Sequence, residues 1–197
     1  MNEQQSQSSR KIIISREIDN QVANQVISAI AEINEYDDQM SALTTYKPEP
    51  IEIIINSHGG TATDGFAIIG AMDASQTPIV TYGFGIVASM ALGIFAKGDY
   101  RISSEYTRFM YHSLSYGLQG FIKDHEDYRK ETNVLQKMYN DLFKDTKLTQ
   151  KIMDDVRHKK IDFYFSAKRA VELGFVDYII EKNRFVDISN DSNSKIQ

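Results

Sequence analysis

One serine of this chain stands in a setting that suits a nucleophile. Ser89 lies in the run Gly85-Ile86-Val87-Ala88-Ser89-Met90-Ala91, where every neighbour is apolar or small. An apolar helix is predicted to begin there, and its free N–H groups and dipole would stabilise a developing oxyanion. The bland alternative is a serine that only caps the helix, and the segment by itself favours that cap.

A serine nucleophile needs a base, and the chain has four histidines. His125 and His158 fall in strongly charged helical segments, which is typical of solvated side chains. His58 precedes a Gly-Gly pair, and His112 ends the apolar run 109–112. Either of these two could reach a site at the carboxyl edge of a sheet, and their positions alone do not choose between them.

The base in turn needs an orienting carboxylate, and backbone N–H groups must meet the oxyanion. Asp162 lies between Ile161 and the aromatic run 163–165, an apolar setting in which an unpaired carboxylate is costly. Asp177, in a strand-like run, is the competing candidate. The pair Gly59-Gly60 is either half of an oxyanion hole or merely a tight turn.

Apolar runs and helical repeats alternate along the chain and define the elements that must position these side chains. Strands are predicted at 11–15, 51–55, 79–82, 100–103, 108–112 and 176–180, and helices over 22–33, 63–74, from 89, over 121–144 and over 168–173. This alternation favours right-handed crossovers and a largely parallel sheet covered by helices, an α/β fold. Sites in such sheets gather at the carboxyl ends of the strands.

The predicted helix over 121–144 is long enough to extend beyond a small domain. It carries an apolar stripe that packs either on its own domain or on a partner, and the two alternatives are evenly balanced. The stripe consists of Val134, Leu135, Met138, Tyr139, Leu142 and Phe143.

Composition excludes several classes of protein. The 22 basic and 27 acidic residues give a net charge of −5, which argues against a nucleic-acid binder. The absence of cysteine excludes disulfides, thiolate metal sites and cysteine nucleophiles. The polar N-terminus lacks the apolar core of a signal peptide, and the apolar run 84–96 is too short to span a bilayer. We therefore expect a soluble, cytoplasmic protein without membrane contact.

Taken together, these segments resemble the proteolytic-subunit family of the ATP-dependent Clp proteases (ClpP). The family's Asn/Asp-Ser-Pro-Gly-Gly turn has its counterpart at 56–60, and its Gly-x-Ala-Ala-Ser-Met-Ala/Gly segment at 85–91. Its Ala-Lys-Gly run matches 96–98, the strand to its base matches 108–112, and its last motifs match 162–167, Ala170 and 174–177. The resemblance runs from about residue 11 to residue 181, in order and with similar spacing.

By this resemblance, Ser89 is the nucleophile, His112 the general base and Asp162 its orienting carboxylate. The backbone N–H groups of Gly60 and Met90 are the implied oxyanion donors, and the side chain of Met90 is free to vary. The substrate peptide lies extended between the segment 60–62 and the strand after His112. The residues implied to contact it are Gly59, Gly60, Thr61, Ser113 and Leu114. The resemblance implies no cofactor and no metal.

The resemblance also implies an organisation for the chain. It assigns 11–181 to a ClpP-like peptidase domain, while the Gln-, Ser- and Asn-rich composition of the ends predicts disorder for residues 1–10 and for the end of the tail 182–197. The fold implied is the spiral of ββα units shared with crotonases, with a protruding handle at about 113–145. Family members form two stacked heptameric rings around a chamber, fed with polypeptide by an AAA+ unfoldase, so a homo-oligomer is expected.

Several departures from the family pattern are visible. His58 replaces the turn proline, and Ser113-Leu114 replaces a Gln-Pro pair. The connection 35–50 is longer than usual, and the N-terminal segment that meets the ATPase ring in the family has only a short polar counterpart. These departures fit a divergent relative, such as a phage-encoded one, and leave the pairing with an unfoldase open.

Three other functions compete with a serine endopeptidase. A ring subunit of weak or no activity is disfavoured because Ser89, His112 and Asp162 are all intact. A crotonase-type acyl-CoA enzyme also uses backbone oxyanion holes but needs no Ser-His-Asp set. A serine-lysine peptidase needs an apolar-flanked lysine near the site, and the nearest candidate, Lys97, is predicted to be solvated.

Overall fold

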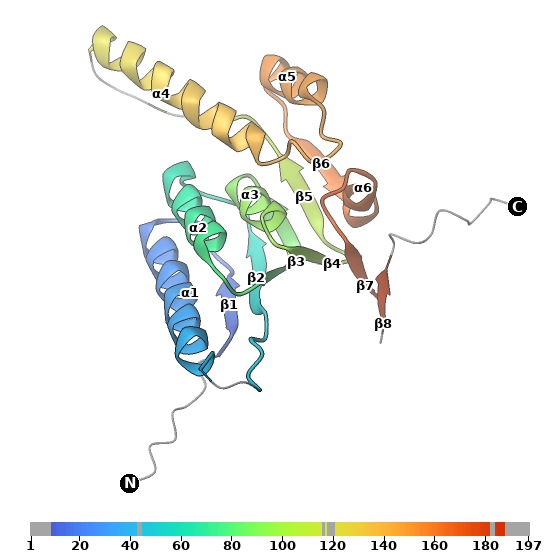
Figure 1. Cartoon of the computed structure of the whole chain (residues 1–197). Coiled ribbons are helices and arrows are strands. Elements are labelled where there is room, and N and C mark those ends of the chain that lie inside the picture. Colours follow the sequence, from blue (N-terminus) through green and yellow to red (C-terminus); the bar gives the residue numbers. More distant parts are fainter. Residues whose placement is uncertain (1–8, 43–44, 116, 118–120, 182–183, 188–197) are drawn as a thin grey trace, which may run out of the picture.

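A sheet with helices packed on one of its faces forms the body of the molecule (Figure 1). The computed structural model describes residues 9–42, 45–115, 117, 121–181 and 184–187. The strands are β1 (Lys11–Ile14), β2 (Ile51–Ser57), β3 (Ile79–Ala88), β4 (Tyr100–Ser104), β5 (Arg108–Tyr111), β6 (Phe163–Ser166), β7 (Tyr178–Glu181) and β8 (Arg184–Asp187). The helices are α1 (Asn20–Met40), α2 (Ala62–Ala74), α3 (Met90–Ala96), α4 (Ile122–Asp141), α5 (Gln150–Lys159) and α6 (Ala167–Glu172).

Most neighbouring strands are parallel, which confirms the α/β class predicted from the alternation of elements. The sheet order is β1-β2-β3-β4-β7-β8, and β8 alone on this path pairs in the antiparallel sense. β3 is longer than predicted and forks. Its residues 80–83 pair with β4, and its residues 86–88 pair with β5. β6 then adds to β5 in the antiparallel sense.

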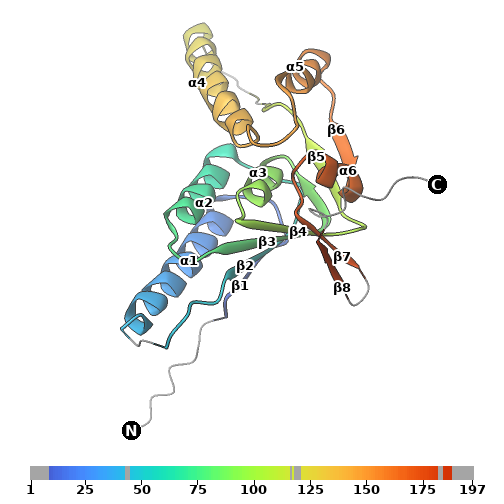
Figure 2. The same ribbon diagram turned by 45° about the vertical axis from the view of Figure 1, so that its right-hand side comes forward.

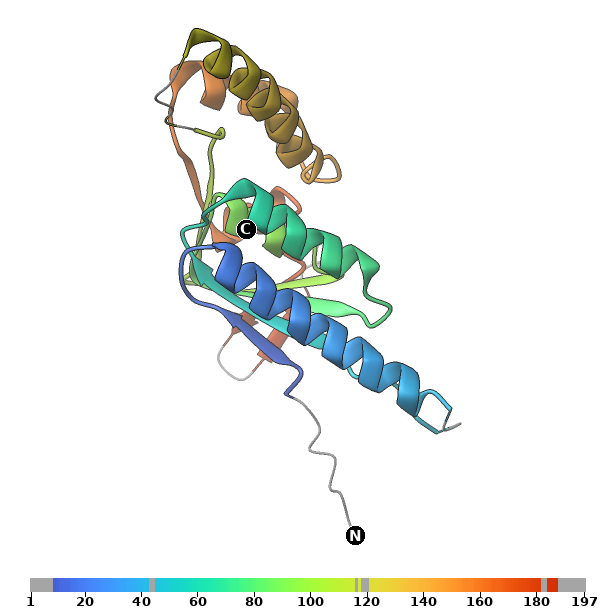
Figure 3. The same ribbon diagram turned by 90° about the vertical axis from the view of Figure 1, so that its left-hand side faces the viewer.

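The core lies between the sheet and the helices α1, α2 and α3. The isoleucines at 51, 53 and 55 of β2 are fully buried and alternate with more exposed residues, as expected for a strand with one face on a core. In β1, Ile12 and Ile14 are buried while Ile13 between them is 66% exposed, so only one face of this strand lies on the core. Within the described chain, the helices α1 and α2 lie side by side on the same face of the sheet (Figure 3).

The first helix extends beyond its predicted end near residue 33 and continues to Met40. Its last turns carry Asp37, which is buried and accepts two hydrogen bonds from Arg10, at 2.9 and 2.6 Å. Thr77 and Tyr46 also donate to this carboxylate. A tertiary ion pair therefore holds a stretch that its polar sequence predicts as a loop. It also orders Arg10, which the sequence assigns to a disordered segment.

α4 projects from one end of the sheet, with α5 beside it (Figures 1 and 2). Part of the apolar stripe predicted on this helix packs on its own domain, and part of it is exposed. Tyr139 and Phe143 are fully buried, and Leu142 packs on the core close to Gly93. Val134 and Met138 remain 53% and 43% exposed. The C-terminal part of the stripe is therefore core, and only its outer members are available to a partner.

Some predictions fall on residues outside this description. The predicted disordered ends, apart from residues 9–10 and 184–187, lie outside the described residues, as do 116 and 118–120 of the predicted handle. α5 is an element that the sequence prediction did not delimit. Of the helices in the described ranges, none is both long and apolar enough to cross a membrane.

Candidate active site

Ser89 lies at a sharp turn between β3 and α3. Its backbone angles, φ 54° and ψ −130°, lie outside the regions that a side-chain-bearing residue ordinarily adopts. Such a conformation costs roughly 1–3 kcal/mol and is typical of functional sites. The Ser89 N–H donates to the Met110 carbonyl at 2.9 Å, which ties this turn to β5. A strand-to-helix turn of this kind exposes a serine hydroxyl at the top of a sheet.

The Ser89 side chain does not cap α3, although Ser89 occupies the N-cap position. Its Oγ lies 2.7 Å from Nε2 of His112, within hydrogen-bond distance. The prediction, favoured by the segment alone, that Ser89 only caps the helix is therefore wrong. His112 follows the last residue of β5, and the parallel pairing of β5 with the end of β3 brings the imidazole beside the serine. His58, the other candidate base, is exposed on its turn.

Positions 59 and 60 require glycine because neighbouring atoms leave no room for a Cβ. Gly59 has φ 100°, and a Cβ there would lie 2.6 Å from the Ser89 Cβ and 2.9 Å from the Met90 nitrogen. A Cβ on Gly60 would lie 2.2 Å from the Ile18 carbonyl oxygen, because this turn is bonded to Ile18 on both sides. In the described part of the chain, the N–H groups of Gly60 and Met90 donate no hydrogen bond. They are thus available near the Ser89 hydroxyl.

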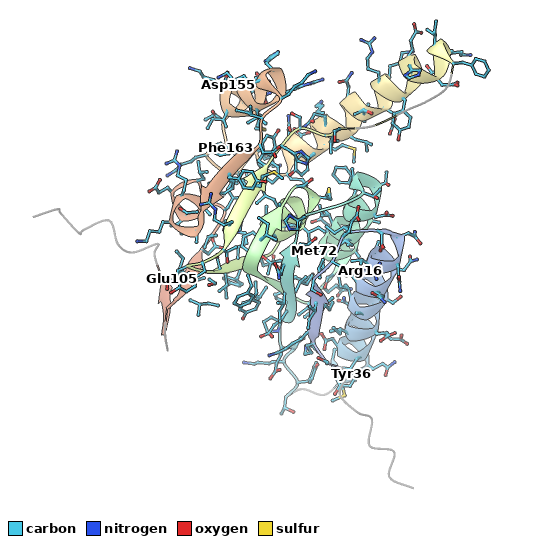
Figure 4. All side chains as sticks on the ribbon, turned by 180° about the vertical axis from the view of Figure 1, so that it is seen from behind. Arg16, Tyr36, Met72, Glu105, Asp155 and Phe163 are labelled. Carbon is cyan, nitrogen blue, oxygen red and sulfur yellow. The ribbon has the colours of Figure 1, made fainter. Side chains whose placement is uncertain are left out.

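Asp162 reaches the site through the pairing of β5 with β6. Tyr111 is paired with Phe163 in this antiparallel ladder, so the next residues out, His112 and Asp162, face one another across the strands. The His112 Nδ1 and the Asp162 Oδ1 are 3.9 Å apart, which is too long for a hydrogen bond. The Asp162 side chain is 50% exposed, so its apolar sequence neighbours do not bury it. Figure 4 shows Phe163 at the start of β6, close to α5.

The competing residues are engaged elsewhere. Asp177 accepts hydrogen bonds from the backbone and guanidinium of Arg101, which joins β4 to the turn before β7. Lys97 forms an ion pair with Asp73 of α2, at 2.6 Å. These contacts assign Asp177 and Lys97 to the structure of the sheet and its helices, and they leave Asp162 as the carboxylate nearest to His112.

Met90 contributes more than its backbone. Its side chain is 1% exposed and fills the space that Gly65 of α2 leaves open, since a Cβ on Gly65 would lie 2.1 Å from the Met90 Cγ. The sequence prediction that this side chain is free to vary is therefore wrong. The Met90 side chain therefore packs α2 against the start of α3, next to the turn that carries Ser89.

Two residues of α4, Gln136 and Tyr139, bond to the backbone of the site, a role that the sequence analysis did not assign to either of them. The Tyr139 hydroxyl donates to the Ser89 carbonyl at 2.8 Å. Burial raises the pKa of Tyr139 well above its ordinary value, so this donor stays protonated. The Gln136 Oε1 accepts from the Leu114 N–H at 2.7 Å, and Gln136 donates to Asn140 at 2.7 Å. Polar residues inside an apolar stripe were the available sequence signal for these contacts.

The Leu114 contact explains one departure from the family pattern. Where the resemblance expects a proline, which has no N–H, this chain has a leucine with one. Leaving a buried backbone donor unpaired costs about 1–3 kcal/mol. Gln136, which is 5% exposed, supplies the acceptor that this donor needs.

Two pockets adjoin His112. One, of about 440 Å³, is lined by Ser89, by the segment 60–63 and by Leu114 and Leu135, so the predicted substrate-contacting segments on its two sides do face one space. The other, of about 570 Å³, contains Asp162 together with the cations Arg129, Arg157 and Lys160. Solvent reaches Asp162 through this second pocket.

Two comparisons with known proteins indicate one and the same family. The sequence pattern of the family described as Clp protease matches residues 3–183 of the chain. Over 183 residues, the chain is 28% identical to a protein of Pseudomonas aeruginosa named ATP-dependent Clp protease proteolytic subunit 2. This similarity covers 91% of the chain and 85% of the relative.

Proposed function

The chain belongs to the Clp protease family, a family of peptidases, and on this premise we propose that it is a serine endopeptidase with Ser89 as nucleophile, His112 as general base and Asp162 as orienting carboxylate. The observation that carries the proposal is the 2.7 Å approach of Ser89 Oγ to His112 Nε2, made by a serine in a strained turn. A nucleophile and its base within hydrogen-bond reach are the signature of covalent catalysis by serine.

The chemistry follows from this pair. Ser89 Oγ attacks the carbonyl carbon of the scissile peptide bond as its proton passes to His112 Nε2. The carbonyl oxygen becomes an oxyanion and accepts from the N–H groups of Gly60 and Met90. As the C–N bond breaks, His112 returns the proton to the leaving amine. Water then attacks the acyl-enzyme, again with His112 as base, and releases the acid and free Ser89.

Asp162 orients the imidazole by accepting from Nδ1–H, which leaves Nε2 free to take the serine proton. Its 3.9 Å separation from Nδ1 must shorten by roughly 1 Å to form that bond. Catalytic hydrogen bonds that are long without substrate commonly tighten when substrate binds. We expect an extended substrate between 60–62 and the segment after His112 to press these groups together.

The substrate class proposed is unfolded polypeptide. The pocket beside Ser89 has an apolar wall from Ala62, Leu114 and Leu135, which fits an apolar side chain next to the scissile bond. Gly59, Gly60 and Thr61 on one side and Ser113 and Leu114 on the other are the proposed contacts. The Leu114 N–H is already bonded to Gln136, so Leu114 contributes its side chain rather than that donor.

Assembly into a closed chamber of two stacked heptameric rings is part of the proposal. It is supported by exposed apolar residues at the start of the projecting helix, its N-cap Phe121 and its first residue Ile122, which are 84% and 82% exposed. Residues 11–181 act as the peptidase domain, with 113–145 as the handle. An AAA+ unfoldase would feed folded substrates into the chamber at the cost of ATP, whereas short peptides need none.

A ring subunit of low activity is the second candidate, and the long distance between His112 and Asp162 is the observation that favours it. The two candidates predict different rates for the reaction of Ser89 with a substrate or a serine-directed probe, fast for the endopeptidase and slow for the subunit of low activity. A crotonase-type acyl-CoA enzyme and a serine-lysine peptidase receive no support from a comparable observation, because Ser89 contacts His112 and Lys97 contacts Asp73.

Labelling with a fluorophosphonate, together with hydrolysis of a fluorogenic peptide, tests the proposal. The wild-type protein should be labelled once per chain, and Ser89→Ala should abolish labelling and lower hydrolysis by about 10⁴-fold or more. His112→Ala should be nearly as damaging, because it removes the base that accepts the serine proton. His58→Pro is the matched control and should be tolerated.

Three outcomes would count against the proposal. Ser89→Ala could keep more than roughly a tenth of the activity, which is far above the loss expected for a nucleophile. His58→Pro could be more damaging than His112→Ala, which would reverse the assignment of the base. A wild-type protein that assembles but is neither labelled nor active would favour the subunit of low activity.

A further inference from the structure

α4 touches the proposed site through a connected set of buried polar side chains. Gln136, Tyr139 and Asn140 are three and four residues apart, which places them on one face of the helix. Gln136 is 5% exposed and Tyr139 is 1% exposed. Buried polar groups are costly unless they are bonded, so the partners of these residues show what holds them there.

Two of these residues, Gln136 and Tyr139, bond to backbone groups at the proposed site, whereas Asn140 bonds to the side chains of Gln136 and Tyr111. The Leu114 N–H can only donate, which fixes the Gln136 amide with Oε1 toward Leu114 and Nε2 toward Asn140. The Tyr139 hydroxyl donates to the carbonyl of Ser89 itself. Two consecutive turns of one helix thus hold one of the two segments that would flank the substrate and the turn that carries the nucleophile.

The aromatic packing below these bonds makes the arrangement rigid. The Tyr111 ring stacks on the Tyr139 ring, with 5.6 Å between centroids and 5° between planes, and its hydroxyl donates to Asn140 at 2.8 Å. Phe143 packs edge-on against both rings. Tyr111 is the residue before His112, so the same cluster also anchors the strand that ends at the proposed base.

From this geometry we propose that Gln136 and Tyr139 are positioning residues with separate tasks. Gln136 holds the substrate-binding segment at Leu114, and Tyr139 holds the nucleophile turn at Ser89. The inference rests on the proposed function, since it assigns tasks within that site. The inference goes beyond the proposed function because it makes the packing of α4 on the site a condition for both peptide binding and reaction.

The two tasks predict different kinetic signatures. Loosening Leu114 weakens contacts that the peptide makes equally in its bound and transition states, which raises KM and leaves kcat nearly unchanged. Loosening the Ser89 turn misplaces the attacking oxygen, which lowers kcat and leaves KM nearly unchanged. A purely structural role for α4 would move KM and kcat together in both variants.

The test compares Gln136→Met and Tyr139→Phe by peptide hydrolysis and by the rate of fluorophosphonate labelling, a probe too small to need the Leu114 segment. Methionine matches glutamine in length but accepts no comparable hydrogen bond, and we expect a KM about 5- to 30-fold higher with labelling within about twofold of wild type. Phenylalanine removes only the hydroxyl, and we expect kcat and the labelling rate to fall together by about 5- to 30-fold.

Two further variants complete the test. Gln136→Asn keeps an amide in the buried space but is one methylene too short to reach Leu114, so its KM should rise as for Gln136→Met. Lys137→Gln changes an exposed neighbour on the same helix and should alter neither constant.

The outcomes separate this inference from the proposed function. A wild-type protein that is neither labelled nor active would refute the proposed function itself. An active wild type whose Gln136 and Tyr139 variants change KM and kcat in parallel, or change neither, would overturn the positioning tasks alone. Loss of all activity in every variant would also overturn them, because it would show α4 to be only a scaffold.

Discussion

Replacing Gly59 by alanine should disable the site while leaving the fold in place. Gly59 has φ 100°, a conformation that costs a residue with a Cβ roughly 1–2 kcal/mol. The new methyl group would lie 2.6 Å from the Ser89 Cβ and 2.8 Å from the Ala88 carbonyl oxygen. Ordinary contacts begin at 3.4 Å, so the turn or the serine must move by several tenths of an ångström.

That displacement falls directly on the proposed nucleophile. A misplacement of about 1 Å can cost about 10²-fold in rate, so for this smaller shift we expect kcat/KM for a fluorogenic peptide and the fluorophosphonate labelling rate to fall by about 10-fold or more. The strain should lower the thermal midpoint by roughly 2–8 °C, at about 2–4 °C per kcal/mol for a chain of this length. Circular dichroism measures the midpoint in the same samples.

Gly70→Ala is the matched control, because a Cβ at Gly70 meets no atom within 4 Å and the residue lies inside α2. It should keep full activity and gain roughly 0.5–1 kcal/mol, the usual advantage of alanine over glycine in a helix. The reasoning fails if Gly59→Ala keeps half or more of the wild-type labelling rate, since the close approach to Ser89 would then be of no consequence.

Two other predictions concern stability and assembly. Burial alone would raise the pKa of Asp37, but hydrogen bonds from Arg10, Thr77 and Tyr46 lower it to about 2, so about 2 kcal/mol of stability should be present above pH 4 and be lost as the pH falls toward 2. Urea titrations at several pH values should show that loss in the wild type and not in Asp37→Asn. The same dependence of the free energy of unfolding on pH in both proteins would contradict the prediction. Met138→Glu should dissociate the oligomer in light scattering without lowering the thermal midpoint of the subunit, whereas Leu142→Glu should lower the midpoint, because Leu142 packs on the core. The opposite ranking of these two variants would place the interface elsewhere.

The sequence by itself determined the class of fold and most of the candidate site. Alternating apolar runs and helical repeats are local properties, and they predicted β2, α2 and the parallel sheet because local periodicity reflects which face of an element is buried. The setting of Ser89 among small and apolar residues was compatible with a nucleophile turn, but by itself it favoured a helix cap. The choice of His112 and Asp162 over His58 and Asp177 came from the family pattern and not from the chemistry of the residues alone.

Only the tertiary structure decided how these residues meet. The register between β5 and β6 sets His112 opposite Asp162, and no local pattern encodes a pairing between segments fifty residues apart in sequence. The bond from Tyr139 to Ser89 likewise joins residues fifty positions apart, and the Arg10–Asp37 pair extends α1 through a stretch that local propensity assigns to a loop. Long-range contacts override local preference at these points because burial of a polar group is tolerated only where a distant segment supplies its partner.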